Sequence, residues 1–153
     1  MIERFQASYE DNKGVVLNFL MEEMRFSLKD DGQQEVKLGR IYDDSPRMMA
    51  LTNGLGGVLY PKNALQSIRA RKLDFLQYSP TNDDVWFRFC NIADGIYCKQ
   101  VLKTPIRFRQ VPFTHHLGIW NINFSRGTDG AIVNNKYIIA SYNHFRLTQL
   151  TED

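Results

Sequence analysis

Four acidic pairs are the first residues in this sequence that could do chemistry. They stand at 22–23, 30–31, 43–44 and 83–84. A general acid and base must converge on one substrate from different elements, and neighbours within a turn rarely do so. Asp30-Asp31-Gly32 also lacks the alternating oxygen ligands of a calcium loop. We therefore interpret the acidic pairs as solvated turn residues.

The histidines and glycines give no stronger signal. His115 and His116 are adjacent, and adjacent residues on a strand point to opposite faces, so they chelate one ion only if they lie in a loop. The run at 54–57, Gly-Leu-Gly-Gly, lacks the Lys-Ser/Thr ending of a phosphate loop and the third glycine of a dinucleotide fingerprint. There is no Gly-x-Ser-x-Gly elbow. We expect no catalytic residue, no metal and no cofactor, and hence a protein that is not an enzyme.

Both cysteines fall in the segment from Asp84 to Leu102, which predicts a β-hairpin. Two runs rich in aromatic and β-branched residues flank a three-residue loop that ends in Gly95. In that register Cys90 lies opposite Cys98 at a hydrogen-bonded pair, where a disulfide fits poorly. We expect two free thiols and a reducing compartment.

A basic middle region suggests a surface for a partner. Arg107 and Arg109 alternate with apolar residues, so both would project from one strand face. In the predicted hairpin, Trp86 and Arg88 would share an outward face. The candidate partner-binding residues are Arg69, Arg71, Trp86, Arg88, Arg107 and Arg109. Such a face suits an acidic protein or single-stranded nucleic acid, or it is a solvated edge protected by cations.

Charge is unevenly distributed along the chain. Residues 1–46 hold six Lys/Arg and ten Asp/Glu, a net charge of −4, whereas residues 62–109 hold nine and four, a net charge of +5. The two regions either neutralise each other within one fold or let copies meet head to tail. Abundant aromatic residues, 10 Phe, 7 Tyr and 2 Trp, leave a sugar-stacking platform open as well.

Turn signals recur between short alternating runs. Gly14, Gly32, Gly54, Gly95 and Gly130 each end such a turn. The pattern predicts a mostly β fold, a single antiparallel sandwich or barrel built from hairpins, with runs at 5–9, 73–78, 106–111, 119–124 and 137–142 among its strands. At most one short helix is expected in the chain, near 63–71, with Asn63 as its cap. Residues 15–28 fit either helix or strand, and the turn that follows favours strands broken near 22–23.

Length and composition fit one domain. The chain has 153 residues, of which 43% are hydrophobic and 24% charged, and no linker divides it. No apolar run is long enough to cross a membrane, and the first residues do not resemble a secretory signal. We expect residues 1–153 to form a single domain at a cytoplasmic or other intracellular assembly site.

These observations predict a non-catalytic structural or interaction module. Its expected role is to assemble with itself or with a larger protein complex, such as the shell, ring or tail of a virion. Two alternatives stay open at this point: a nucleic-acid-binding protein that uses the basic aromatic face, and a carbohydrate-binding β-sandwich.

Overall fold

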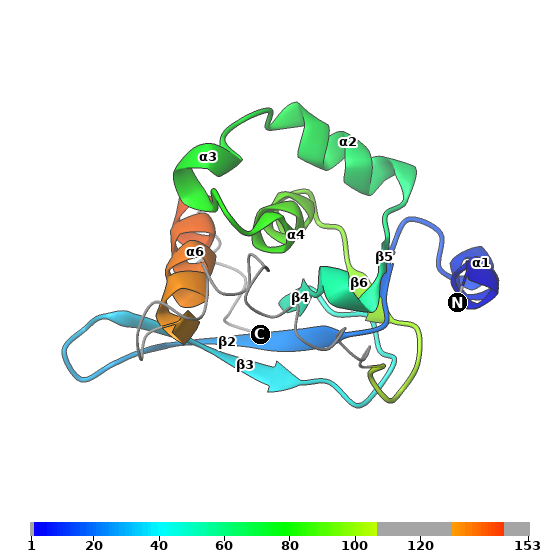
Figure 1. The fold of residues 1–153 in the computed structure, drawn as a ribbon, viewed down its shortest axis with the longest axis horizontal. Coiled ribbons are helices and arrows are strands. Elements are labelled where there is room, and N and C mark those ends of the chain that lie inside the picture. The colour runs from blue at the N-terminus through cyan, green and yellow to red at the C-terminus, as the bar shows by residue number, and fades with distance from the viewer. Residues whose placement is uncertain (1, 107–129, 146–153) are drawn as a thin grey trace, which may run out of the picture.

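The structure, a computed structural model, describes residues 2–106 and 130–145. In this part of the chain, one helix is followed by five strands, then by three helices, a sixth strand and a last helix (Figure 1). The helices are α1 (Ile2–Asp11), α2 (Lys62–Ala70), α3 (Phe75–Tyr78), α4 (Asp83–Ala93) and α6 (Gly130–His144), with a short 3-10 turn, η1 (Gly54–Gly56). The strands are β1 (Val16–Asn18), β2 (Met21–Leu28), β3 (Gln34–Arg40), β4 (Ala50–Thr52), β5 (Val58–Leu59) and β6 (Cys98–Gln100).

The fold is mixed α/β, so the prediction of a mostly β sandwich or barrel is wrong. One sheet has the strand order β3-β2-β4 and is antiparallel. The other has the order β5-β1-β6, in which β1 pairs antiparallel with β5 and parallel with β6. Helices α2, α3, α4 and α6 all lie on the same side of β2 and β3 in Figure 1.

The predicted hairpin from Asp84 to Leu102 is the clearest error. Its first half is helix α4, and its second half contains β6, which pairs with β1 rather than with residues 85–92. Val85, Phe87 and Phe89 alternate as in a strand, but Val85, Phe89 and Ile92 stand at positions i, i+4 and i+7, and these last three are all buried. Asn82 caps this helix through Val85 N–H, and Gly95, with φ of 71°, follows its end.

Three other predicted strands are also helical. The run at 5–9 lies in α1, the run at 73–78 contains α3, and the run at 137–142 lies in α6. Each run is short and apolar, and such runs do not distinguish a strand from a buried helix. The predicted strands at 106–111 and 119–124 lie wholly or almost wholly outside the described residues.

Other sequence predictions are confirmed. A short helix near 63–71 is α2, although Pro61 rather than Asn63 is its N-cap, and the Asn63 side chain donates to the Gly14 carbonyl instead. Residues 15–28 do form strands, with the break at 19–20 rather than at 22–23. The Asp30-Asp31-Gly32 turn joins β2 to β3, and Gly32 has the positive φ, 79°, that this turn requires.

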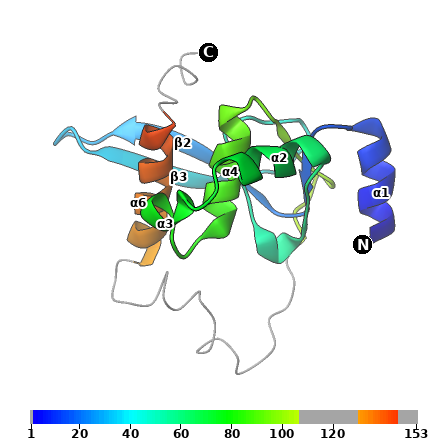
Figure 2. The same cartoon turned by 90° about the horizontal axis from the view of Figure 1, so that it is seen from above.

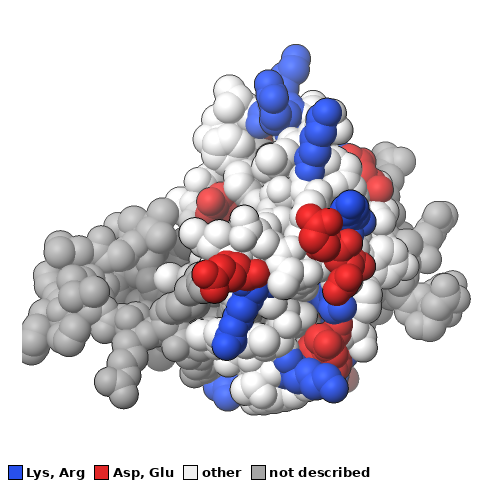
Figure 3. All heavy atoms as spheres, turned by 90° about the vertical axis from the view of Figure 1, so that its right-hand side faces the viewer, with Lys and Arg blue, Asp and Glu red and all other residues white. Residues whose placement is uncertain are grey.

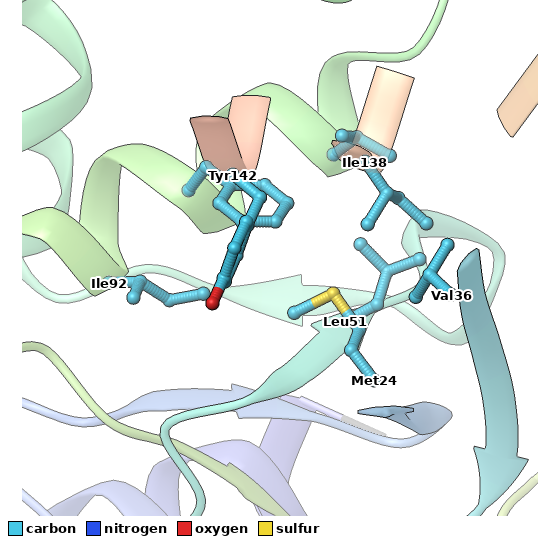
Figure 4. Packing of buried hydrophobic residues seen from close by; sticks show 8 residues of the cluster. Met24, Val36, Leu51, Ile92, Ile138 and Tyr142 are labelled. Carbon is cyan, nitrogen blue, oxygen red and sulfur yellow. The ribbon is translucent and has the colours of Figure 1, made fainter. Parts of the chain in front are cut away.

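The main hydrophobic core lies between the β3-β2-β4 sheet and helices α4 and α6. Figure 4 shows Ile138 and Tyr142 of α6 directed towards Met24, Val36 and Leu51 of the sheet, with Ile92 of α4 beside them. Segments from both ends of the described chain therefore stabilise one core.

Two elements extend from this body. Helix α1 stands at one edge of the molecule in Figure 2 and buries only Phe5, whose ring lies 4.5 Å from that of Phe19. The β2–β3 hairpin projects in the opposite direction in the same view. No helix among the described residues is long and apolar enough to cross a membrane.

Candidate functional site

The first turn of α4 places two carboxyl groups beside a glycine loop. Asn82 begins the helix by accepting a hydrogen bond from Val85 N–H at 3.2 Å, and Asp83 and Asp84 follow it. Asp83 is exposed, whereas Asp84 points towards η1, where its Oδ2 accepts a hydrogen bond from Gly54 N–H at 2.8 Å. Of the acidic pair at 83–84, the first side chain therefore faces solvent and the second faces the η1 backbone.

Close packing explains the glycine at position 54. A Cβ atom added there would lie 2.8 Å from Asp84 Oδ1, and one added at Gly56 would lie 2.8 Å from the backbone nitrogen of Leu20. Gly57 has a φ of 76°, which also favours glycine. The three glycines thus allow the loop to approach both α4 and the start of β2.

A buried asparagine holds this loop in place. Asn18, fully buried at the end of β1, donates through Nδ2 to the carbonyls of Asn53 and Gly57, at 3.0 and 2.6 Å. Its Oδ1 accepts from Leu20 N–H at 3.0 Å and from Asn53 N–H at 3.3 Å. The Asn18 amide therefore has a complete set of hydrogen-bond partners, and these bonds hold the loop that carries the Gly54 N–H facing Asp84.

The surroundings of Asp84 disfavour its charged form. Burial, the largest cause, raises the pKa of Asp84 to about 6, and the neighbouring charge of Asp83 acts in the same direction. The hydrogen bond from Gly54 N–H opposes this shift. Among the described residues no lysine or arginine forms an ion pair with Asp84, so the single hydrogen bond from Gly54 N–H compensates for only part of its lost hydration.

Tyr60 is the second titratable group in this environment. Burial raises the pKa of its hydroxyl, and the negative charges of Asp84 and Asp83 add to the effect. Its ring packs edge-on against Phe87 of α4, with 6.0 Å between centroids. Asp84 and Tyr60 together form what we call the Asp84 site: a partly buried carboxyl group, a protonated phenol and the η1 backbone.

Of the residues predicted to bind a partner, the four that the structure describes are not brought together at one surface. Trp86 is only 1% exposed and Arg88 is fully buried, so the outward face expected for them does not exist in this structure. Arg69 is exposed on α2, and Arg71 forms an ion pair with Asp94 at 2.6 Å. Arg107 and Arg109 lie outside the described residues.

Arg88 acts instead as an internal clamp. Its guanidinium donates to the carbonyls of Ala50 at 2.7 Å, Ile96 at 2.9 Å and Arg47 at 3.2 Å, and also to that of Met48. These carbonyls belong to two separate backbone segments, residues 47–50 and Ile96, which Arg88 joins to α4. Burial lowers the pKa of this guanidinium, yet every contact serves its charged form.

The remaining candidate groups are structural. Cys90 and Cys98 are free thiols, as predicted, and both are buried. The hairpin from which the free thiols were predicted is nevertheless wrong. Burial raises the pKa of both thiols, which makes them poor nucleophiles. The His144 ring stacks on Tyr78 with centroids 4.0 Å apart, while His115 and His116 lie outside the described residues.

Charge on the surface is mixed rather than separated into two halves. Figure 3 shows basic side chains gathered at the α2 end of one face, and acidic and basic side chains side by side over the rest of it. Arg47 joins Glu23 and Asp43 at 2.8 and 2.5 Å, so part of the acidic first third is neutralised locally.

Sequence reasoning missed the Asp84 site because it considered each motif separately. The acidic pair was interpreted as a solvated turn and the glycine run as a loop without a ligand. The available signal was the combination of Asn82, a helix-capping residue, with two carboxylates directly after it. That the glycine loop touches this turn depends on a contact 30 residues apart in the chain.

No protein-family model matches this chain, and no curated protein or solved structure matches it.

Proposed function

We propose that the Asp84 site is an acid–base site, in which the Asp84 carboxylate accepts a proton from a hydroxyl group or water molecule bound beside η1. The observation that carries this proposal is a partly buried carboxyl group with one N–H partner, no ion-pair partner among the described residues, and a pKa raised to about 6. A base with a pKa near the working pH combines a populated charged form with useful basicity.

The geometry around Asp84 supports this role over a purely structural one. A structural carboxylate at a helix start usually caps free N–H groups of its own helix, and in α4 the side chain of Asn82 already does so. Asp84 turns away from its own helix to the η1 backbone. The Tyr60 phenol, kept protonated by burial and by the charges of Asp84 and Asp83, lies in the same electrostatic environment, with the Thr52 side chain beside it.

The test is a direct titration of Asp84. Carboxyl carbon chemical shifts, followed by NMR from pH 3 to pH 8, should give Asp84 a pKa of about 6. Asp30, exposed at the β2–β3 turn, is the internal reference signal in the same spectra. An ordinary pKa for Asp84 would contradict the proposal.

A ligand screen then addresses the substrate. We expect small polyhydroxylated compounds to raise the melting temperature of the native protein, and Asp84→Asn to abolish that shift. Asp30→Asn is the matched control and should keep it. If Asp84→Asn responds to the same compounds as strongly as the native protein, the site does not bind them through its carboxylate.

Assembly with other protein chains is a second proposal, because large apolar side chains are exposed on neighbouring elements. Leu73 and Leu76, in and just before α3, are 67% and 57% exposed, and Leu65 of α2 is 47% exposed. Light scattering over a range of concentrations tests self-association, and Leu76→Lys should reduce any oligomer. A monomer at all concentrations would argue against self-assembly. A nucleic-acid role has weaker support, since Trp86 and Arg88 are buried.

A further inference from the structure

Helix α6 is tied to the short segment that leads into the Asp84 site. Asn82 Nδ2 donates to Asn134 Oδ1 of α6 at 2.8 Å, and Thr81 Oγ1 donates to the Tyr137 hydroxyl at 3.1 Å. The two α6 residues are three positions apart, which places them on one side of the helix. They reach the two residues that directly precede Asp83 and Asp84.

Asn82 is the connection between α6 and the first turn of α4. Its Oδ1 caps α4 at Val85 N–H, while its Nδ2 is held by Asn134. Its carbonyl accepts from Ser79 Oγ at 2.5 Å. Because one planar amide makes both side-chain hydrogen bonds, the bond to Asn134 fixes the orientation in which Oδ1 faces the helix.

We infer that Asn134 is a positioning residue of the Asp84 site: through Asn82 it holds the first turn of α4 so that the Asp84 carboxylate stays against Gly54. The inference rests on the proposed acid–base function, because it assigns to α6 the support of that same site. Helix α6 begins 46 positions after Asp84 in the sequence. The inference gives this helix a role in addition to packing in the hydrophobic core.

The groups around Asp84 explain why its position depends on this support. The negative charge of Asp83 raises the pKa of Asp84, and Tyr60, whose own pKa the charge of Asp84 raises, is neutral. Arg88, one turn further along α4, is fully committed to backbone carbonyls. No described cation holds Asp84, so the packing of α4 against η1 must do so.

Helix α6 has enough other contacts to stay docked without the Asn134 side chain. Ile138 and Tyr142 are buried in the main core, and the Tyr142 ring stacks on Phe26 with centroids 4.1 Å apart. The variant Asn134→Ala should therefore fold. Asn135→Ala is a matched control, because it removes the same side chain from the next residue, which has no hydrogen bond to Asn82 among the described contacts.

The experiment is the NMR titration of Asp84 in Asn134→Ala, in Asn135→Ala and in the native full chain. Release of the first turn admits water to Asp84 and also weakens the favourable helix N-terminus, but burial is the largest cause of the raised pKa. We expect the pKa of Asp84 to fall by about one pH unit in Asn134→Ala, a tenfold change in proton affinity. Asn135→Ala should leave it unchanged.

Each outcome bears on a definite statement. A raised pKa in the native chain that persists in Asn134→Ala overturns the positioning role and leaves the acid–base proposal intact. An ordinary pKa in the native chain overturns the acid–base proposal itself. An equal fall in both variants shows a general effect of altering α6, and this too overturns the role of Asn134.

Discussion

Helix α4 carries two ionisable residues one turn apart, Asp84 and Arg88, and their charges differ in how far hydrogen bonds compensate for burial. The Arg88 guanidinium is fully buried but donates to four backbone carbonyls. The Asp84 carboxylate is partly buried but accepts from one N–H, that of Gly54. One charge is therefore well compensated, and the other is not.

This difference indicates the role of each group. A buried charge with a complete set of hydrogen bonds holds together the segments that contain its partners. Removing that charge leaves the partners buried without a hydrogen bond. A carboxylate with one partner titrates within the physiological range, which is a property of functional sites more often than of structural ones. The comparison therefore assigns Arg88 to the fold and Asp84 to the proposed function.

The largest expected effect comes from Arg88→Met. Loss of the guanidinium removes a donor from four backbone carbonyls in two segments, each at a cost of about 1–3 kcal/mol where no other donor is present, so we expect the unfolding free energy to fall by at least about 3 kcal/mol. Urea denaturation measures this. Arg88→Lys should lose less, because an ammonium keeps some of the hydrogen bonds.

Arg69→Met is the control for Arg88, since Arg69 is exposed on α2. Its unfolding free energy should stay within about 0.5 kcal/mol of the native value. A loss below about 1 kcal/mol for Arg88→Met would show that water or other donors replace the guanidinium, and the contrast between the two charges would disappear.

The intermediate effect is a gain in stability for Asp84→Asn at neutral pH. The pKa of Asp84 is about 6 in the folded chain, against an ordinary value of 3.8, so protonation favours folding. Its stabilising contribution is complete below pH 3.8 and is lost as the pH rises through about 6. Above that pH the native protein holds an uncompensated charge, and Asp84→Asn should be more stable by about 2 kcal/mol.

Denaturation of both proteins from pH 3 to pH 8 tests this prediction. The difference in unfolding free energy should increase between pH 3.8 and about 6 and then remain constant. Asp30→Asn, which removes a carboxylate from an exposed turn, is the control variant. A difference that does not depend on pH would mean that Asp84 has an ordinary pKa.

The smallest effect is expected at the ion pair between Asp94 and Arg71, near the end of α4. Hydrogen bonds from Arg71 lower the pKa of Asp94, so the pair stabilises the fold above pH 3.8 and its contribution is lost as the pH falls below that value. Because Asp94 is 41% exposed, Asp94→Asn should cost only about 0.5 kcal/mol at pH 7. Asp11→Asn, on the exposed side of α1, is the control in the same urea experiments. A cost equal to that of Arg88→Met would contradict the ranking.

Some of the fold could be predicted from the sequence, where the signal is local. The β2–β3 hairpin followed from Asp30-Asp31-Gly32 between two alternating runs, and α2 followed from a helical pattern after Pro61. Both depend on residues within about ten positions of each other, and their local preferences agree with the tertiary structure.

The segment at 84–102 shows why the rest could not. The same apolar residues satisfy a period of two and a period of 3.6, and only the contact of Val85, Phe89 and Ile92 with the sheet decides between them. Once the segment is helical, Trp86 and Arg88 turn inwards, and the predicted binding face is lost.

The sequence by itself determined turns such as the one at Gly32, and it supplied the groups of the Asp84 site: the Asp84 carboxyl group, the Tyr60 phenol and the glycine loop. Only the tertiary structure decided that Asp84 meets Gly54 and that Asn134 meets Asn82, because these pairs are 30 and 52 residues apart. The raised pKa of Asp84 likewise depends on burial by distant segments. Chemistry that depends on desolvation is a property of the packed molecule, and composition or spacing alone does not reveal it.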